Sequence, residues 1–352
     1  MLPNTIYTGK FNAGHIQGIA IDEERGFLFC SFTTVLTKHT LDGQLIGSVT
    51  GLAGHLGCIT YDKKNDRVIG SLELKHDKIG LGILSMTGKK ISEEDAFYMV
   101  EFDAKKIDKP NLDAEKDGIM RSVYLFDVCR DYSSLDEASG SAHRYGCSGI
   151  DGVAIGPSPK NTSEEKILVA YGIFSETERQ DNDYQVLLEY SPSVFEKYGK
   201  PLLQSEPHHS GPKSFDNRYF VYTGNTNYGI QNLEYDDYTN CYIAAVYPGK
   251  KESFTPFNLF FINSASCTEK VLKGRAGERG LTLSLNAFLG EIGKEDIRGS
   301  HFPLGATGIY SLGGGNYYFS ENHRDPETKE QYSYIKKFKF DNSASVPFIE
   351  CN

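Results

Sequence analysis

An eight-residue segment that recurs along the chain is the feature that most constrains its fold. It first occurs as His15–Asp22 (HIQGIAID), in which isoleucines recur between polar and small residues. Similar segments follow at residues 55–62, 149–156, 229–236 and 305–312. A strand-like segment that returns in this way predicts a fold assembled from repeated structural units.

Each repeat is followed by further short runs that are rich in β-branched and aromatic residues, as β-strands are. In the first unit these runs are residues 27–33, 35–41 and 44–49. The later units have runs at 68–74, 96–102 and 121–128; at 167–174, 184–190 and 201–204; at 242–247, 258–263 and 270–272; and at 317–320, 333–340 and 345–349. Five units of four strands predict an all-β fold, a five-bladed β-propeller with four-stranded antiparallel blades around a central channel. A six-bladed propeller is the alternative.

The repeats extend along the whole sequence, so we expect residues 1–352 to form a single propeller domain. Their uneven spacing predicts insertions at about residues 75–95, 129–146 and 275–299. Residues 131–145 are rich in Ser, Asp, Glu and Gly, which is typical of a surface loop.

Two further segments predict how the ring is completed. Leu281–Leu285 alternates like a strand, and residues 287–297 have the composition of a short helix. Thr5–Gly9 is expected to join the last blade and close the ring, because an unpaired strand edge would favour aggregation.

The first unit also resembles known propeller families. Gly-Ile-Ala-Ile-Asp at residues 18–22 and Thr-Leu-Asp-Gly-Gln at residues 40–44 are similar to the NHL and gluconolactonase-like propellers, over Gly14–Gly51. This resemblance implies a propeller fold and the hydrolysis of a small lactone. His-Ile-Gln-Gly at residues 15–18 also looks like the Phe-Thr-Gln-Gly opening of the glutaminyl cyclotransferases, a five-bladed propeller family, and this resemblance implies a glutaminyl cyclotransferase-like activity as a third alternative.

Composition excludes several classes of partner. Lys and Arg number 37 against 47 Asp and Glu, which gives a formal net charge of -10. Without a basic face, nucleic-acid binding is not expected. No apolar stretch approaches the roughly 20 residues that span a bilayer, so we expect a soluble protein without a membrane partner. A closed ring needs no second copy, and we expect a monomer.

The seven cysteines are scattered and never form a C-x-x-C motif. This pattern disfavours a zinc knuckle or a disulfide framework. We expect buried thiols in a cytoplasmic protein, since the first residues also lack a signal-peptide pattern. An export signal removed from a longer precursor is the alternative.

The innermost strands of a propeller line its channel, and side chains two residues apart on a strand point the same way. The polar residues that this rule turns toward the axis are His15, Gln17, His55, Asp151, Gln231 and Thr307. His15, His55 and Asp151 predict a site for a divalent metal, either calcium or a transition metal. The alternative is a water-filled pore whose polar side chains bind one another.

The second strand of each blade runs antiparallel to the first, so its end lies beside the start of the first. This places Glu73, Glu321, Asn322 and His323 near the same face. Glu73, Asp151 and Glu321 are the candidate catalytic acids and bases. The candidate ligand-binding residues are Gln17, Gln231, Thr307, Asn322 and His323. Solvated strand ends with ordinary pKa values are the alternative for Glu73 and Glu321.

The sequence therefore predicts that a small polar molecule, a sugar derivative or lactone, binds at the mouth of the channel. Metal-assisted hydrolysis is one form of this function. The other is a noncatalytic propeller that binds a ligand or a protein partner through residues 131–145 and 275–299. The sequence leaves open whether the protein is an enzyme.

Overall fold

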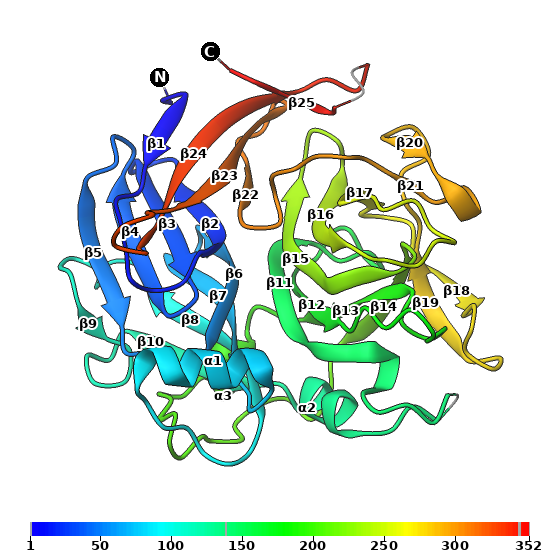
Figure 1. Cartoon of the computed structure of the whole chain (residues 1–352), viewed down its shortest axis with the longest axis horizontal. Coiled ribbons are helices and arrows are strands. Elements are labelled where there is room, and N and C mark those ends of the chain that lie inside the picture. Colours follow the sequence, from blue (N-terminus) through cyan, green and yellow to red (C-terminus); the bar gives the residue numbers. More distant parts are fainter. Residues whose placement is uncertain (1, 138, 344–345, 352) are drawn as a thin grey trace.

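The computed structural model is a five-bladed β-propeller, as the sequence predicted (Figure 1). The structure describes residues 2–137, 139–343 and 346–351.

Blade 1 contains β2 (Ile16–Asp22), β3 (Phe27–Phe32), β4 (Val35–Thr40) and β5 (Leu45–Thr50), with β9 (Leu112–Asp113) beside β5. Blade 2 contains β6 (His55–Asp62), β7 (Arg67–Leu74), β8 (Ala96–Asp103) and β10 (Met120–Tyr124). Blade 3 contains β11 (Cys147–Pro157), β12 (Glu165–Ile173), β13 (Tyr184–Tyr190) and β14 (Asn217–Tyr222), extended by β19 (Arg279–Leu283) and β18 (Thr268–Val271).

Blade 4 contains β15 (Thr226–Asp236), β16 (Cys241–Pro248) and β17 (Leu259–Asn263). Blade 5 contains β22 (Ile309–Ser311), β23 (Asn316–Arg324) and β24 (Gln331–Phe340), with β1 (Thr5–Tyr7) and β25 (Phe348–Glu350) both paired to β24. A separate hairpin joins β20 (Glu291–Ile292) to β21 (Arg298–Gly299). The strand segments of the sequence repeats are thus the innermost strands, β2, β6, β11, β15 and β22.

Hydrophobic side chains fill the spaces between neighbouring blades. Among the described residues they form clusters between blades 1 and 2, 2 and 3, 3 and 4, 4 and 5, and 5 and 1. Each blade therefore buries one face against the next, and this burial is the main stabilising contribution to the ring.

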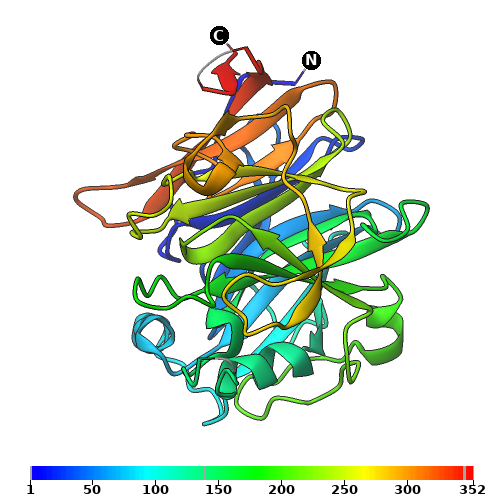
Figure 2. The ribbon, with the colours of Figure 1, turned by 90° about the vertical axis from the view of Figure 1, so that its right-hand side faces the viewer.

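The two ends of the chain meet on blade 5 and close the ring, and they lie near each other at the top of Figures 1 and 2. β1 pairs antiparallel with β24, where Ile6 lies opposite Ile335, and both side chains are buried between blades 5 and 1. The Tyr318 hydroxyl donates a hydrogen bond to the Pro3 carbonyl. The predicted role of Thr5–Gly9 in closing the ring is confirmed.

The outer strands are where the sequence prediction was wrong. Residues 201–204 form no strand, and β14 supplies the outer strand of blade 3 from farther along the chain. Residues 270–272 belong mainly to β18, which pairs with β19 in the sheet of blade 3 and not with blade 4. The run 121–128 is divided between β10 and a helix. Outer strands have fewer neighbours to specify them, so their sequence pattern is weak.

The insertions contain the helices. α1 (Lys78–Thr87) lies in the first insertion, α2 (Phe126–Ser133) leads into the second, and α3 (Val194–Tyr198) follows β13. Short 3-10 turns occur at Arg144–Gly146 and Lys294–Asp296, so residues 287–297 are a hairpin and a turn and not the predicted helix. No helix among the described residues is long and apolar enough to cross a membrane.

The predicted surface loop 131–145 is partly buried, because ion pairs attach it to blade 3. Asp131 is fully buried and accepts hydrogen bonds from Tyr171 and Arg218, while Tyr145 packs in the core between blades 2 and 3. Residue 138 lies outside the described residues.

Candidate functional site

The innermost strands share an irregularity near the channel mouth. The pairing register shifts between Ile16 and Gly18, between Leu56 and Ile59, between Ile150 and Val153, and between Ile230 and Asn232. A β-bulge adds a residue to one strand and redirects its side chain. Gln17, Asp151 and Gln231 are the residues at three of these bulges, and their side chains meet in one cavity.

This cavity has a volume of about 430 Å3 and is lined by six of the residues that the sequence singled out. They are His15, Gln17, His55, Glu73, Asp151 and Gln231. We name it the channel-mouth cavity. The apolar residues that neighbour them on the inner strands are buried between the blades: Ile16, Leu56, Ile150 and Ile230.

Glu73 and Lys75 form a buried ion pair that lines the cavity. Glu73 lies directly opposite His55 in the β6–β7 pairing, and Lys75 follows two residues later on the same face. Lys75 Nζ lies 2.8 Å from Glu73 Oε2 and donates to the Ser148 carbonyl at 2.8 Å. Glu73 Oε1 accepts the Ile150 N–H at 2.6 Å. Each polar atom of this pair therefore has a partner.

Asp151 has a different environment from Glu73. Its Oδ2 accepts a hydrogen bond from Gln231 Nε2 at 2.9 Å, and its Oδ1 lies 3.4 Å from His55 Nδ1. Glu73 Oε2 lies 3.7 Å from the same imidazole nitrogen. His55 Nδ1 is buried and has no hydrogen-bond partner among the described residues. Two carboxyl groups thus flank one unpaired imidazole.

Two glycines make room for these carboxyl groups. A Cβ at Gly149 would overlap Glu73 Oε1, and Gly149 has φ +128, which disfavours other residues. A Cβ at Gly57 would lie 2.9 Å from Asp151 Oδ1. At these two positions a side chain would therefore displace the carboxyl groups of the cavity.

Asp151 and Glu73 lie in different environments, which shift the pKa values of their carboxyl groups to different extents. Burial, and then the nearby charge of Glu73, raise the pKa of Asp151 well above its ordinary value. Burial also raises the pKa of Glu73, but the Lys75 ammonium and the Ile150 N–H oppose this shift. Asp151 is therefore the carboxyl group of the two whose environment favours the protonated form, and the Lys75 ammonium favours the ionised form of Glu73.

Both histidines of the cavity are neutral. Burial, and then the Lys75 charge, lower the pKa of His55 to about 3. Burial lowers the pKa of His15, and its Nε2 lies 3.2 Å from Gln17 Nε2, which also donates to Thr33 Oγ1 at 3.1 Å. A neutral imidazole can accept the hydrogen bond from the Gln17 amide.

The predicted site residues of blade 5 do not line the channel-mouth cavity. The Thr307 hydroxyl lies 3.0 Å from that of Ser320, and Asn322 Nδ2 donates to the Ile16 carbonyl at 3.2 Å. Glu321 pairs with Lys336 at 2.5 Å and with His323 at 3.0 Å, and the Lys336 hydrogen bond lowers the pKa of Glu321. β22 begins only at Ile309, so Thr307 lies in the turn before it, whereas Glu321, Asn322 and His323 lie on β23.

The predicted metal ligands were His15, His55 and Asp151. Among the described residues no group of three or more His, Cys, Asp or Glu side chains is arranged to hold a metal ion. Among the described residues of the cavity, His55 Nδ1 is a nitrogen without a hydrogen-bond partner that could bind a metal ion. The negative charge of Glu73 is already neutralised by the Lys75 ammonium. His55 and Asp151 are thus the two predicted ligands whose side chains lie close together, 3.4 Å apart, whereas the His15 ring contacts Gln17.

Several residues of the cavity were not predicted from the sequence. Lys75 had a usable signal, because it follows Glu73 by two residues on the same strand face. Ile79 and Ile83 line the cavity from α1, four residues apart on one helix face. Tyr228 and Phe174 also line it. They lie in a bulge and after a strand end, positions that the repeat pattern does not identify.

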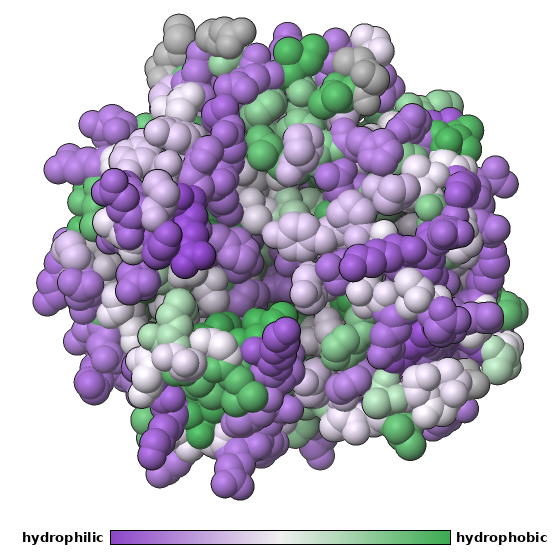
Figure 3. Space-filling view, viewed as in Figure 1, coloured by the Kyte–Doolittle hydropathy of each residue, from purple (hydrophilic) through white to green (hydrophobic). Residues whose placement is uncertain are grey.

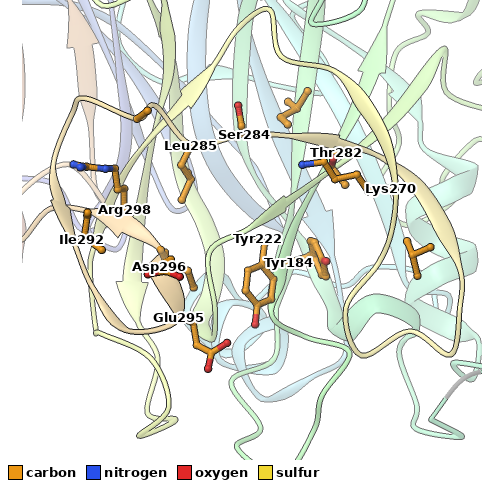
Figure 4. Close-up of a pocket in the computed structure, with 14 residues that line it drawn as sticks. Tyr184, Tyr222, Lys270, Thr282, Ser284, Leu285, Ile292, Glu295, Asp296 and Arg298 are labelled. Atoms are coloured by element: carbon orange, nitrogen blue, oxygen red, sulfur yellow. The ribbon is translucent and has the colours of Figure 1, made fainter.

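A second hollow lies on the outer side of the ring, between the β18–β19 extension and the β20–β21 hairpin (Figure 4). Its volume is about 580 Å3, and Tyr184, Tyr222 and Leu283 lie on its wall. Glu295 and Asp296 are its acidic residues, and both are exposed. It lacks the buried, closely spaced titratable groups of the channel-mouth cavity, which is therefore the better candidate site.

Comparisons with known proteins assign no family. No family model matches the sequence, and no curated protein matches it significantly. Solved structures similar over most of the chain include an arabinanase from Bacillus subtilis, with 10% identity, TM-score 0.43 and coverage of 97% of this chain and 99% of that one. The soluble aldose sugar dehydrogenase of Escherichia coli has 8% identity, TM-score 0.37 and coverage of 94% and 98%. The periplasmic gluconolactonase of Pseudomonas aeruginosa has 10% identity, TM-score 0.32 and coverage of 95% and 70%.

Proposed function

We propose that the protein is an acid–base hydrolase that opens a small polar lactone or a related sugar derivative in the channel-mouth cavity. The observation that carries this proposal is the pair of Asp151 and His55, whose side chains are each 13% exposed and lie 3.4 Å apart. The raised pKa of Asp151 favours its protonated form, the lowered pKa of His55 favours the neutral imidazole, and both side chains line the cavity. A titratable pair with opposed roles is what acid–base hydrolysis requires.

The chemistry follows from the protonation states. A water molecule attacks the carbonyl carbon of the lactone and gives a proton to the neutral His55 imidazole. The bond between that carbon and the ring oxygen breaks, and Asp151 donates its proton to the leaving oxygen. His55 then returns its proton to Asp151, 3.4 Å away, and both groups regain their starting state.

The remaining polar residues would support this reaction. Protonation of His55 creates a positive charge next to the Glu73 carboxylate, 3.7 Å away, which favours that step in a buried site. Gln231 fixes the orientation of the Asp151 carboxyl group through its hydrogen bond to Oδ2. The Gln17 amide and the His15 ring are placed to bind ligand hydroxyl groups.

Hydrolysis of glucono-1,5-lactone is the direct test. We expect proton release above the spontaneous rate, and a loss of kcat/KM of at least about a hundredfold in His55→Ala, the usual contribution of a proton-transfer residue. Glu321→Gln, outside the cavity, is the matched control and should retain the wild-type rate. Equal rates for wild type and His55→Ala on a panel of five- and six-membered lactones would exclude the proposed reaction.

A metal-assisted form of the hydrolysis is the second candidate, because His55 Nδ1 lacks a partner among the described residues. His55, Asp151 and, after a shift, His15 would hold the ion, which would supply charge stabilisation for the carbonyl oxygen. Elemental analysis of the purified protein should find a stoichiometric divalent ion if this form is correct. A metal-free protein with full activity would exclude it, and a His15→Ala protein that keeps the ion would remove His15 as a ligand.

A further inference from the structure

The channel-mouth cavity has both polar and apolar lining. Charged and polar groups around Asp151 and Lys75 line it together with the side chains of Ile79, Ile83, Phe174, Tyr228 and Tyr247, which we call the apolar wall. Ile83 is buried, and Ile79 has 42% of its surface exposed. A ligand that is polar throughout would leave this apolar wall without a partner.

Tyr228 provides a second, independent observation on the same wall. It has φ +65, in the left-handed region that a bulky aromatic residue rarely adopts, and it is 42% exposed. Its carbonyl accepts a hydrogen bond from Gln231 Nε2 at 3.2 Å, and its ring meets that of Tyr247 edge-on, 6.3 Å between centroids. Strained backbone of this kind concentrates at ligand sites. Here the bulge holds an aromatic ring at the edge of the cavity.

α1 continues the apolar wall outward. It is an insertion between β7 and β8 that exposes Leu81 by 53% and Met86 by 44%, in addition to Ile79. Figure 3 shows hydrophobic surface gathered over the α1 segment. Only Gly80 and Ile83 of this helix are buried. Beyond its N-cap residue Asp77, which contacts Lys75, α1 therefore extends the apolar wall from the cavity toward the outer surface.

We propose that the ligand of this site is amphiphilic: a lactone or ester whose polar head lies at Asp151 and His55 and whose acyl or alkyl substituent lies between Tyr228 and Ile79 of α1. This inference rests on the proposed function and narrows its substrate class. The cavity volume of about 430 Å3 also exceeds what a five- or six-membered ring alone would fill, and it lies in the range of drug-sized ligands.

A series of γ-lactones with unbranched side chains of zero to six carbons tests the inference. Burial of each methylene in the apolar wall should strengthen binding about threefold to fourfold over the first carbons. Binding is measured by calorimetry with the full-length protein, and kcat/KM by proton release, at lactone concentrations that form no micelles. Glucono-1,5-lactone should bind more weakly than the longer members.

Two surface variants separate the cavity wall from general hydrophobic adsorption. Ile79→Ser should reduce the gain per methylene, because Ile79 lines the cavity, whereas Leu81→Ser on the same helix should leave it unchanged. Both side chains are exposed enough for these changes to spare the fold. Equal effects of the two variants, or an affinity that does not depend on chain length, would overturn the inference.

The outcomes for this inference and for the proposed hydrolysis are distinguishable. Turnover of glucono-1,5-lactone without dependence on chain length would support hydrolysis and overturn the amphiphilic ligand. Binding that increases with chain length in the absence of turnover would support the amphiphilic ligand and overturn hydrolysis. Failure of every lactone to bind would overturn both.

Discussion

Replacement of Asp151 by asparagine is expected to lower kcat/KM by about two to four orders of magnitude while the propeller stays folded. The variant loses the proton that the leaving oxygen receives, and general acid catalysis typically contributes this much. The side-chain amide has nearly the same shape, its oxygen can still accept the hydrogen bond from Gln231, and its NH2 group can face the unpaired His55 Nδ1. Rates over the lactone panel, with circular dichroism as the fold control, measure the effect.

The pH dependence of the wild-type rate provides a second measurement of the same group. Activity requires protonated Asp151, so kcat/KM should fall as pH rises through the raised pKa of that carboxyl group. The other requirement, a neutral His55, is met above its pKa of about 3, so no loss is expected from about pH 4 up to the raised pKa of Asp151. A rate that instead rises toward alkaline pH would show that Asp151 is not the proton donor.

The stability of the Asp151→Asn protein should depend on pH in a defined direction. A folded-state pKa above the unfolded value means that wild type loses stability as pH rises from the ordinary aspartate value of about 3.9 toward the raised value. Asparagine has no such loss, so the variant should become more stable relative to wild type as pH increases. Urea unfolding at several pH values measures this difference, and a difference that stays constant would contradict the assigned burial of an uncharged carboxyl group.

The repeat predicted the inner strands of the fold well, because side chains alternate with a period of two residues along each strand. Alternation on the inner strand β6 placed His55 at the channel, and antiparallel pairing placed Glu73 directly opposite His55. These relations depend on strand geometry alone. The sequence could therefore predict most of one cluster of site residues without knowledge of the loops.

The rest of the site depends on local irregularities of the strands, which the two-residue alternation of side chains does not predict. The bulges that redirect Gln17, Asp151 and Gln231 add residues to the strands, and Tyr228 owes its position to such a bulge. Blade 5 shows the reverse case, since the late start of β22 at Ile309 removes Thr307 from the cavity. The monomeric state and the cytoplasmic location stay predictions.

Lys75→Met is expected to reduce the free energy of unfolding by about 3–5 kcal/mol, the usual cost of removing one partner of a buried ion pair. The Lys75 side chain is 6% exposed, and its ammonium group contacts Glu73 Oε2 at 2.8 Å, the Ser148 carbonyl at 2.8 Å and Asp77 Oδ2 at 3.3 Å. Methionine fills a similar space but leaves the Glu73 carboxylate buried without a cation. Urea unfolding at neutral pH measures the loss.

The double variant Lys75→Met/Glu73→Gln separates the charge from the packing. The glutamine oxygen can still accept the Ile150 N–H, and no buried charge remains, so the double variant should regain most of the stability lost in Lys75→Met. Without Lys75 the pKa of Glu73 rises further, so the single variant should lose additional stability as pH increases above the ordinary glutamate value of about 4.3 and should approach the double variant below it. If the single and double variants are equally unstable at neutral pH, the loss comes from packing, and Lys75 is not what allows Glu73 to be ionised beside a protonated Asp151.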